Sequence, residues 1–398
     1  SLKFKVILFG FIFTFFSSFG QSYFLGLFNS SIRDALSITH GQFGSIYASA
    51  TLCSSLLLIW VGKKIDDVNI FKFALFVIIL LSFACFFFSK VSSVLLLFIA
   101  IFLMRFSGQG MMSHTASTTI SRYFTKTRGR ALSISWFGLS SAEFIMPVLM
   151  VYLLTIIDWQ NLWLIFSITV LIILPIASFL LIKNLNLDSR EDSNKDIKEV
   201  EIKQWKRAEV IKDYRFYIIS SNMLAMPWIF TGFAVFQSFI QTSKGWGPYV
   251  IAQSFMSYSI FSVLTLFLSG FLIDKFTSRK LLIYMNIPLL LSVIVLFFFD
   301  SPVTAFIFLG LVGISNGFAN ILGSSTWAEL YGVKYLGSIK ALTTALMVFA
   351  TAFGTALFGY LIDIGFSVGD IAVVSGSYIF ISLILLFLVR KKLNPVII

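Results

Sequence analysis

The stretch FIAIFLMRFSGQG, residues 98–110, places one arginine, Arg105, inside an otherwise uncharged run that covers residues 92–117. A helix needs about 20 mostly apolar residues to cross roughly 30 Å of hydrocarbon, so this run is long enough to span a bilayer. An isolated charge at mid-bilayer costs about 2.5–3.5 kcal/mol on insertion scales. The stretch therefore predicts a membrane helix whose arginine either has a partner or serves a function.

The rest of the chain has the composition of a membrane protein. Of its 398 residues, 58% are apolar and only 12% are charged, and the mean hydropathy is +0.92. Soluble domains carry about twice this share of charged residues. We predict an all-α membrane protein with twelve transmembrane helices, whose approximate cores are 6–28, 41–61, 73–89, 92–117, 131–154, 161–182, 216–242, 249–272, 281–299, 302–327, 339–360 and 371–389.

The basic residues predict the orientation of these helices. With the amino terminus in the cytoplasm, all 30 Lys and Arg residues fall on the cytoplasmic side except Arg33, Lys90, Lys244 and the buried Arg105. This bias predicts that both termini are cytoplasmic. It also accounts for the net charge of +12, so the expected partner is a lipid bilayer and no nucleic acid. The short loops suggest a multi-pass protein of a bacterial inner (plasma) membrane.

One long polar segment divides the chain into halves. Residues 183–213 are expected to form a cytoplasmic linker between a six-helix bundle at 1–182 and another at 214–398. Most of this segment reads as a solvated connection. An alternative for its second half is a short amphipathic helix on the membrane surface, with an apolar side formed by Ile197, Val200, Ile202 and Trp205.

The two halves repeat each other. Gly62 and Asp66 follow the second predicted helix, and Gly270 and Asp274 follow the eighth, 208 residues later. Three further pairs recur at offsets of 207, 208 and 216, namely Gly110 with Gly317, Gly129 with Gly337, and Gln21 with Gln237. Such a constant register predicts two homologous six-helix bundles.

At these residues the chain resembles the major facilitator superfamily of secondary transporters. The loop motif of that family is matched by Gly270, Asp274, Lys275, Arg279 and Lys280. The first copy departs from the motif at two positions after Asp66, with Asp67 in place of a basic residue and Asn69 in place of a glycine. The family's fourth-helix motif, an arginine before a Gln/Gly-rich turn, is matched by Arg105, Gly108, Gln109 and Gly110.

Two further stretches, RYFTKTRGRALSI (122–134) and ELYGVKYLGSIKAL (329–342), look like the subgroup that includes monocarboxylate and oxalate/formate carriers. The resemblance implies that helices 1, 4, 7 and 10 line a central cavity. The substrate-binding candidates on those helices are Gln21, Tyr23, Arg105, Gln109, Trp228, Gln237, Gln241, Asn316 and Asn320. The resemblance also implies a cytoplasmic conformational latch, with Gly62, Asp66, Arg128, Gly270, Asp274 and Arg279 as its residues. The alternative is that the basic loops only set the orientation of the helices in the membrane.

Lys340 is the second residue of its predicted core, so Arg105 and Glu143 are the only charges deep within the predicted helix cores. Each lies about 12 residues along its helix, which at 1.5 Å per residue puts both near the midplane on consecutive antiparallel helices. We therefore expect them to pair, at least in one transport state. In one reading the pair only locks the two helices together. In the other, Arg105 binds an anionic substrate while Glu143 takes up the coupling proton.

The remaining candidates have an alternative structural role. Gln237 and Gln241, like Asn316 and Asn320, are four residues apart and share a helical face. Hydrogen bonds between helices would explain these amides equally well. Trp228 lies deep in its helix rather than at a membrane boundary, where it would form either a cavity wall or part of the packed core.

The sequence thus predicts a monomeric, proton-coupled symporter for a small organic anion, such as a monocarboxylate, that works by alternating access. One alternative is an exporter or exchanger of amphiphilic or cationic compounds with Glu143 as the proton site. Another is a non-transporting membrane sensor. No enzyme activity, cofactor or metal is expected, because we find no nucleophile with a base, and the two histidines, His40 and His114, lie far from any cysteine pair.

Overall fold

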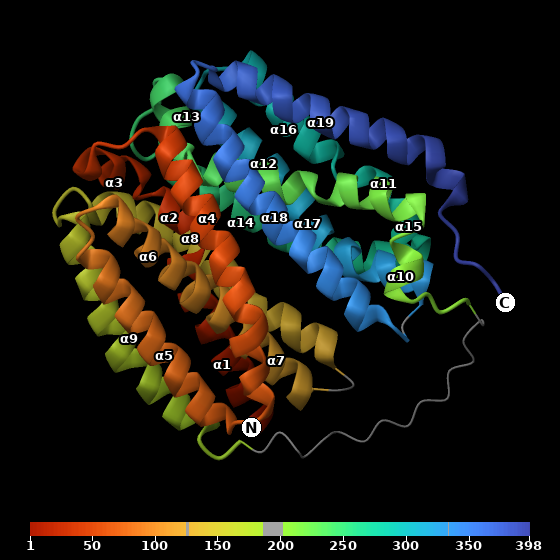
Figure 1. Cartoon of the computed structure of the whole chain (residues 1–398), viewed down its shortest axis with the longest axis horizontal. Coiled ribbons are helices and arrows are strands. Elements are labelled where there is room, and N and C mark those ends of the chain that lie inside the picture. The colour runs from red at the N-terminus through yellow and green to blue at the C-terminus, as the bar shows by residue number, and fades with distance from the viewer. Residues whose placement is uncertain (125–126, 186–201, 333) are drawn as a thin grey trace. The chain divides into compact units, whose positions relative to one another are not determined.

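The computed structural model describes residues 1–124, 127–185, 202–332 and 334–398, and this part of the chain is almost entirely helical (Figure 1). It divides into two compact units, Ser1–Lys195 and Asp196–Ile398. Twelve helical segments of the described residues are long and apolar enough to cross a membrane. Each overlaps one of the predicted spans, so the prediction of a twelve-helix membrane fold is confirmed.

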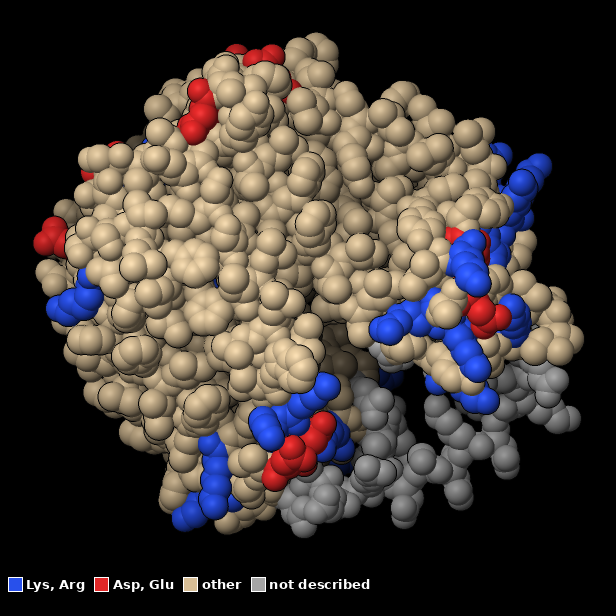
Figure 2. All heavy atoms as spheres, in the orientation of Figure 1, with Lys and Arg blue, Asp and Glu red and all other residues tan. Residues whose placement is uncertain are grey.

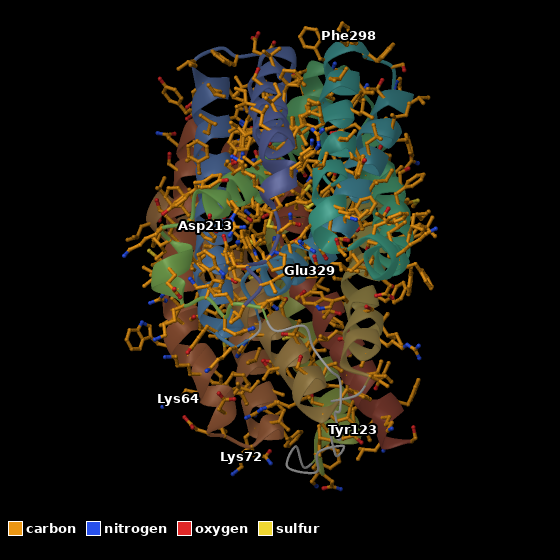
Figure 3. The ribbon with its side chains drawn as sticks, turned by 90° about the vertical axis from the view of Figure 1, so that its right-hand side faces the viewer. Lys64, Lys72, Tyr123, Asp213, Phe298 and Glu329 are labelled. Atoms are coloured by element: carbon orange, nitrogen blue, oxygen red, sulfur yellow. The ribbon has the colours of Figure 1, made fainter. Side chains whose placement is uncertain are left out.

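The first unit holds six spans, of which the first and the fourth are interrupted. Its elements are α1 (Leu2–Phe16), η1 (Ser17–Gly20), α2 (Ser22–Gly26), α3 (Asn29–Leu36), α4 (His40–Val61), η2 (Gly62–Asp66), α5 (Ile70–Ser89), α6 (Val94–Met104), η3 (Arg105–Met112), α7 (Ser113–Tyr123), α8 (Arg128–Leu153) and α9 (Trp159–Ile182). Figure 3 shows Lys64, Lys72 and Tyr123 together at one end of this unit.

The second unit holds the other six spans. Its elements are α10 (Arg207–Val210), α11 (Tyr214–Met223), α12 (Ala225–Val235), α13 (Gln237–Ser243), α14 (Val250–Phe276), α15 (Ser278–Leu281), η4 (Leu282–Tyr284), α16 (Ile287–Phe298), α17 (Val303–Tyr331), α18 (Leu336–Asp363), α19 (Val368–Val389) and η5 (Arg390–Lys392). In Figure 3, Phe298 marks one end of this unit, and Asp213 and Glu329 lie toward the other.

The same helix pairs pack within each unit. In the first unit, the first span packs on the fifth, the second on the fourth and the third on the sixth. The second unit repeats all three pairings. The pairing of the first span with the fifth, for example, is α1 on α8 in the first unit and α12 on α18 in the second. Glycines permit the first of these contacts in both units. A Cβ added at Gly138 would lie 1.9 Å from the Phe11 carbonyl oxygen, and one added at Gly354, 216 residues later, would lie 2.1 Å from that of Trp228. The repeat seen in the sequence is therefore also a repeat of packing.

Polar caps fix where several spans begin. Thr39 accepts a hydrogen bond from the Gln42 backbone N–H at 3.1 Å, and the Gln42 side chain accepts one from the Thr39 N–H at 2.9 Å. Ser367 and Asp370 form an equivalent capping box before α19. These side chains satisfy N–H groups that the first helical turn leaves without intrahelical partners.

Large apolar side chains cover much of the outside of both units. Phe271 is 75% exposed, Trp60 is 72% exposed and Leu388 is 70% exposed. Exposed apolar surface of this extent is typical of helices that face lipid. The protein is thus a multi-pass integral membrane protein.

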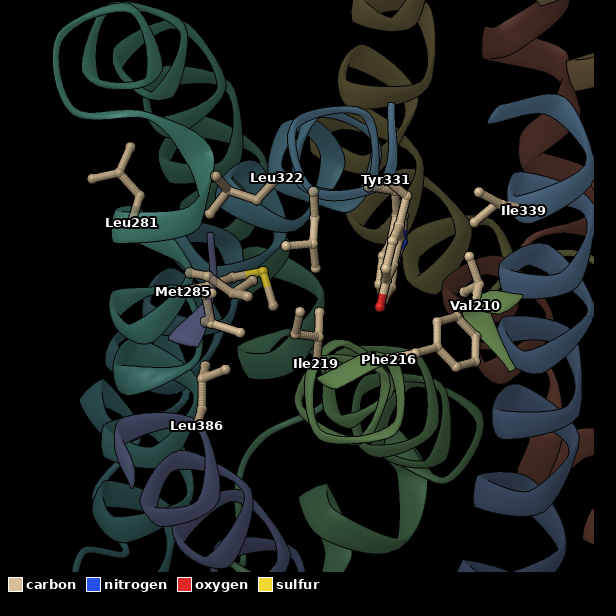
Figure 4. Close-up of a cluster of buried hydrophobic side chains, with 13 residues drawn as sticks. Val210, Phe216, Ile219, Leu281, Met285, Leu322, Tyr331, Ile339 and Leu386 are labelled. Carbon is tan, nitrogen blue, oxygen red and sulfur yellow. The ribbon is translucent and has the colours of Figure 1, made fainter. Parts of the chain in front are cut away.

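The second unit buries a compact apolar cluster near the ends of α11, α17 and α19 (Figure 4). Phe216 and Trp327 pack with ring centroids 5.2 Å apart, and Trp327 stacks on Tyr331 at 5.9 Å. Leu393, beyond the last span, is only 3% exposed and belongs to the same cluster. The segment that follows the last span is therefore anchored to the second unit.

The expected linker at 183–213 is only partly described. Residues 186–201 lie outside the described part, including Ile197 and Val200 of the possible amphipathic helix. Residues 203–206 are not helical, and Ile202 forms an antiparallel β-bridge with Ile397. The alternative of an amphipathic helix is therefore not seen at residues 202–206, because the backbone there pairs with residues near 397, where the Lys203 N–H donates to the Val396 carbonyl at 2.8 Å.

Candidate functional site

The first span is broken midway, and the break creates the centre of the candidate site. After α1 the chain tightens into the 3-10 turn η1, and Gln21 then adopts an extended conformation (φ −82°, ψ 150°) before α2 begins. A helix break removes intrahelical acceptors and donors, so its backbone groups need other partners inside a membrane. The Gly20 carbonyl finds such a partner in Arg105.

Arg105 is 4% exposed and begins η3, a π-helical segment of the fourth span. Its Nη1 donates to the Gly20 carbonyl oxygen at 2.8 Å and to the Ser22 Oγ at 3.4 Å. π-helical segments are rare and are found frequently at functional sites. The arginine therefore connects two irregular backbone segments, one in each of two neighbouring spans.

Tyr47 of α4 completes the surroundings of the guanidinium. The Arg105 Cζ lies 5.3 Å from the centroid of the Tyr47 ring, within the range of a cation–π contact. The Tyr47 hydroxyl and the Ser22 Oγ are hydrogen-bonded at 2.7 Å. Two hydroxyls and an aromatic face thus surround a buried cation.

One edge of the guanidinium includes an unsatisfied hydrogen-bond donor. Both hydrogen bonds of Arg105 leave from Nη1, and its buried Nε–H has no acceptor among the described residues. A buried donor without a partner costs about 1–3 kcal/mol, and more on a charged group. Nε and Nη2 form the edge through which arginine binds a carboxylate with two parallel hydrogen bonds. The Nε edge of Arg105 therefore holds a buried donor that no described residue satisfies.

Two glycines allow the broken first span to meet the fourth span this closely. A Cβ at Gly20 would lie 2.3 Å from the Met104 carbonyl oxygen and 2.4 Å from the Gln109 backbone nitrogen. A Cβ at Gly108 would lie 2.7 Å from the Gly20 nitrogen. Only residues without a side chain permit this backbone contact, which holds the Gly20 carbonyl within reach of Arg105.

Glu143 is also buried, at 8% exposure, on α8. It forms no ion pair with Arg105 within the part of the chain that the structure describes, so the expected pair is not formed in this structure. The reason is geometric: the Arg105 Nη1 is held instead by the Gly20 carbonyl and the Ser22 hydroxyl of the broken first span.

The structure places the other first-unit candidates around the same break. Gln21 donates weakly from Nε2 to the Ser17 Oγ at 3.4 Å, and Tyr23 is 3% exposed. Gln109 is partly buried and follows Arg105 by four residues within η3. Gln21, Tyr23, Gln109 and Arg105 therefore belong to one region of the first unit.

Trp228 lies in an aromatic cluster of the second unit. Its ring is 4% exposed and meets Tyr378 edge-on at 5.2 Å, with Phe353 at 5.9 Å and Phe358 at 6.2 Å. Its carbonyl oxygen forms the close contact with Gly354. This placement favours core packing over a cavity wall.

The second-unit amides differ from one another. Gln237 is 6% exposed and donates to the Ala234 carbonyl at 2.8 Å. Asn316 donates to Ser262 of α14 at 2.7 Å, which is a hydrogen bond between helices. Gln241 is partly buried and Asn320 is exposed. The interhelical alternative therefore fits Asn316 and not Asn320.

The first-unit latch candidates contact the end of the fourth span. Asp66 forms an ion pair with Arg122 at 2.9 Å, and Arg122 also reaches the Ile65 carbonyl at 3.4 Å. The His114 Nε2 lies 2.8 Å from the Gly62 carbonyl oxygen, which is hydrogen-bond distance. The side chain of Arg128, the basic residue expected here, lies outside the described residues. The sequence reading did not identify Arg122 as the partner of Asp66.

One of the second-unit latch candidates, Arg279, contacts a carboxylate that was not predicted from the sequence. Glu329 accepts hydrogen bonds from the backbone N–H groups of Ser278 (2.9 Å) and Arg279 (3.2 Å) and from the Arg279 Nε (3.3 Å). Asp274 is exposed, and no atom lies within 4 Å of a Cβ added at Gly270. Arg279 is thus the latch candidate that makes the charged contact.

A second ionic group joins the start of the seventh span to the end of the chain. Arg215 Nε donates to both carboxylate oxygens of Asp213 (3.1 and 2.9 Å), and its Nη1 donates to the carbonyls of Lys392 and Asn394. Burial acts to raise the pKa of the Asp213 carboxyl, but the hydrogen bonds and charge of Arg215, together with the Tyr331 hydroxyl, outweigh it and hold this pKa below its usual value.

Sequence signals for the missed residues were weak. Asp213 caps α11 by accepting from the Arg215 N–H at 3.0 Å, and an aspartate before a helix is a recognisable cap. Ser22 and Tyr47 carry no such signal, because they lie far from Arg105 in the chain. Within the described residues no group of His, Cys, Asp and Glu side chains could hold a metal ion.

Comparisons with known proteins agree with this architecture. The sequence model of the Major Facilitator Superfamily matches residues 10–252. The solved structure of a bacterial homolog of the human lysosomal transporter Spinster, inward-facing and unoccupied, is similar with a TM-score of 0.73 and 13% identity, over 99% of this chain and 98% of that chain. The nucleoside transporter NupG is similar with a TM-score of 0.71 and 14% identity, over 99% of each chain.

No curated protein matches the chain in sequence. The family model nevertheless covers more than half of the chain, and the structural likeness extends over nearly all of it. Together with the twelve spans and the repeated packing, these findings show that the chain belongs to the Major Facilitator Superfamily and is a transporter, not an enzyme.

Proposed function

We propose that this transporter is a secondary active carrier that moves a small organic anion together with a proton by alternating access. The observation that supports the proposal most strongly is the buried Arg105 guanidinium, which is held through Nη1 while its Nε–H has no acceptor among the described residues. A carboxylate would accept from Nε and Nη2 in the bidentate geometry that arginine favours. Monocarboxylates and oxalate- or formate-like anions are the proposed substrates.

Hydroxyl and amide groups near Arg105 would orient the substrate. Ser22 and Tyr47 present hydroxyls beside the guanidinium. Further contacts are proposed for the remaining candidates, which are Gln21, Tyr23, Gln109, Trp228, Gln237, Gln241, Asn316 and Asn320. Among them, Asn320 is exposed, whereas Trp228 and Asn316 would act mainly by holding helices in position.

Glu143 is the proposed proton site, because it is buried without an ionic partner in the described part of the chain. A buried charge without a partner is costly, so carboxylate and guanidinium both gain from neutralisation. Binding an anion neutralises Arg105, and binding a proton neutralises Glu143. A carrier loaded with both carries no uncompensated buried charge at either residue, which couples the two movements in one direction.

The latch residues are proposed to stabilise one conformational state. Asp66 with Arg122, and Arg279 with Glu329, join loops to span ends within each unit. Gly62, Gly270, Asp274 and Arg128 are proposed to contribute to the same contacts in other states.

A second candidate function is proton-coupled export or exchange of amphiphilic or cationic compounds. The observation in its favour is the same uncompensated Glu143, since a buried carboxylate also binds a cation. The Nε edge of Arg105 argues against it, because a guanidinium repels cationic ligands.

A ligand screen with a matched substitution tests the proposal. Thermal shifts of the purified protein would be measured with formate, oxalate, lactate and succinate, an uncharged nucleoside, and a quaternary ammonium compound. We expect a carboxylate to stabilise the unmodified protein. Arg105→Lys keeps the charge but not the forked geometry, so it should bind the carboxylate at least about tenfold more weakly. Arg130→Lys, at an exposed arginine, is the control.

Proteoliposome uptake then tests the coupling. Uptake driven by a pH difference should be lost in Glu143→Gln, while exchange of substrate across the membrane persists. Accumulation against a gradient by Glu143→Gln would exclude this residue as the coupling site. Unchanged carboxylate binding in Arg105→Lys, or stabilisation by the quaternary ammonium alone, would overturn the anion proposal.

A further inference from the structure

A cavity of about 630 Å³ lies at one end of the C-terminal unit, and all its lining residues belong to that unit. Its walls come from the end of α14, from α15 and η4, and from η5 with the residues that follow it. At this place three membrane spans begin or end, namely Val250–Phe276, Ser278–Phe298 and Val368–Lys392. The cavity therefore lies where the polar headgroups of a bilayer meet the protein.

One side of this cavity is strongly basic. Arg279, Lys280, Arg390 and Lys391 all line it. Glu329 neutralises Arg279, but no ion pair within the described ranges neutralises the other three side chains. Figure 2 shows Lys and Arg gathered over the region where Figure 1 places α15 and the C-terminus. Such a group of unpaired cations attracts an anion.

The other side of the cavity is apolar and continues into the lipid-facing surface. Leu272, Phe276 and Tyr284 line it, and Phe276 and Tyr284 are 43% and 59% exposed. Along α14 the exposed residues Leu264, Phe267, Leu268 and Phe271 follow the spacing of a single helical face. A phospholipid whose acyl chain lies along this face would have its headgroup beside the cations.

We propose that this cavity binds the headgroup of an anionic phospholipid, with the phosphate beside Lys280, Arg390 and Lys391 and the acyl chains against the apolar wall. Basic pockets between spans at the membrane surface are suited to such headgroups. The orientation rule for membrane proteins explains cations near this end of the spans. It does not explain a cavity of this volume with cations on one side and an open apolar wall on the other.

A soluble phosphate or a nucleotide would use only half of this site. Phosphate alone would leave Leu272, Phe276 and Tyr284 without a partner, whereas a phospholipid fills both parts. The proposal rests on these residues alone and does not depend on the transported substrate.

Binding measurements on the purified full-length protein test the proposal. Dioctanoyl phosphatidylglycerol, dioctanoyl phosphatidylcholine and inorganic phosphate would each be titrated in detergent, with affinity read by microscale thermophoresis. The variant Lys280→Gln/Lys391→Gln removes two cations of the cavity. The matched control Lys275→Gln/Lys392→Gln removes two neighbouring cations that do not line it.

We expect phosphatidylglycerol to bind at least tenfold more tightly than phosphatidylcholine or phosphate. A cation near the membrane surface contributes about fivefold in affinity, so the cavity variant should bind phosphatidylglycerol about 20-fold more weakly, while the control variant keeps most of the affinity. Equal losses in the two variants would overturn the proposal. So would equal binding of the two lipids, or phosphate binding as tightly as phosphatidylglycerol. Unchanged melting temperatures without lipid would confirm that both variants fold.

Discussion

Arg122 of the first unit and Glu329 of the second are 207 positions apart, in the register that relates Gly110 to Gly317, and they carry opposite charges at equivalent places. Arg122 pairs with Asp66 at 2.9 Å, and Glu329 pairs with Arg279 at 3.3 Å. In each unit the end of the fourth span of the bundle thus binds the loop after the second span. The repeat retains the contact while its polarity is reversed.

Reversing the charges of the first pair tests this contact. Asp66→Arg or Arg122→Asp alone should slow transport and lower stability by up to about 1 kcal/mol, since both side chains are partly exposed. The double variant should recover most of both losses. Asp67→Arg, at the neighbouring exposed aspartate, is the control. If the losses of stability and transport in the double variant equal the sum of the losses in the two single variants, the pair makes no contribution.

The second pair should be more important for folding. Glu329→Gln weakens contacts to two backbone N–H groups and to Arg279, whose side chain is 20% exposed. We expect a loss of about 1–3 kcal/mol in the free energy of unfolding, because hydrogen bonds to charged groups are the stronger class. Thermal unfolding would measure it. A melting temperature equal to that of the unmodified protein would contradict the assignment.

The contact between the broken first span and the fourth span predicts a steric effect. Gly20→Ala would place a Cβ 2.3 Å from a backbone oxygen and 2.4 Å from a backbone nitrogen. Overpacking of this kind costs about 1–3 kcal/mol or more, and the shift of the Gly20 carbonyl should also weaken substrate binding.

Gly129→Ala is the matched control for Gly20→Ala. No atom lies within 4 Å of the added Cβ, and the residue is helical and exposed, so alanine should be neutral or stabilising by about 0.5–1 kcal/mol. Thermal stability and ligand shifts of the two variants would be compared. Equal thermal stabilities and ligand shifts in the two variants would show that the backbone around Gly20 can move to make room for a methyl group.

Asp213 predicts a dependence of stability on pH. Burial acts to raise the pKa of its carboxyl, but the hydrogen bonds and charge of Arg215 outweigh burial. They hold this pKa below the usual value for an aspartate, which is about 4. A carboxyl with a lowered pKa in the folded state stabilises the protein fully above its unfolded pKa, and this stabilisation is lost as the pH falls through the folded value.

Asp213→Asn should therefore lower stability at neutral pH, by about 3 kcal/mol, because it leaves the largely buried Arg215 without its anion. The difference from the unmodified protein should shrink as the pH falls below about 4. Melting temperatures between pH 3 and pH 7 would provide the measurement. A difference that does not change over this range would exclude Asp213 as the titrating group.

Tyr47 allows two contributions at the candidate site to be separated. Tyr47→Phe keeps the ring near Arg105 and removes only the hydroxyl bonded to Ser22, which is worth about 0.5–1.5 kcal/mol. Tyr47→Leu also removes the cation–π contact. We expect anion affinity to fall in both variants and to fall further in Tyr47→Leu. Equal affinities for the two variants would show that the ring face is not used.

Much of the fold could be predicted from the sequence. A bilayer accepts only long apolar helices with internally satisfied backbones, so the length and spacing of the apolar runs predicted all twelve spans. The recurring register of Gly62 with Gly270 and of Gly110 with Gly317 predicted the repeat, which the packing of Gly138 and Gly354 reproduces. The same constraint made Arg105 a candidate, because a charge there is costly without a partner.

Only the tertiary structure decided which partners these residues have. Small residues around Gly20 and Gly108 permit a helix break and a π-helical segment, but they do not require them. Arg105 was expected to pair with Glu143 because their depths match, yet depth along a helix does not determine the direction of a side chain around it. The carbonyl freed by the break in the first span is 85 residues away in the chain, and it holds Arg105 instead. Partners this distant are brought together by packing, which the sequence of each helix does not specify by itself.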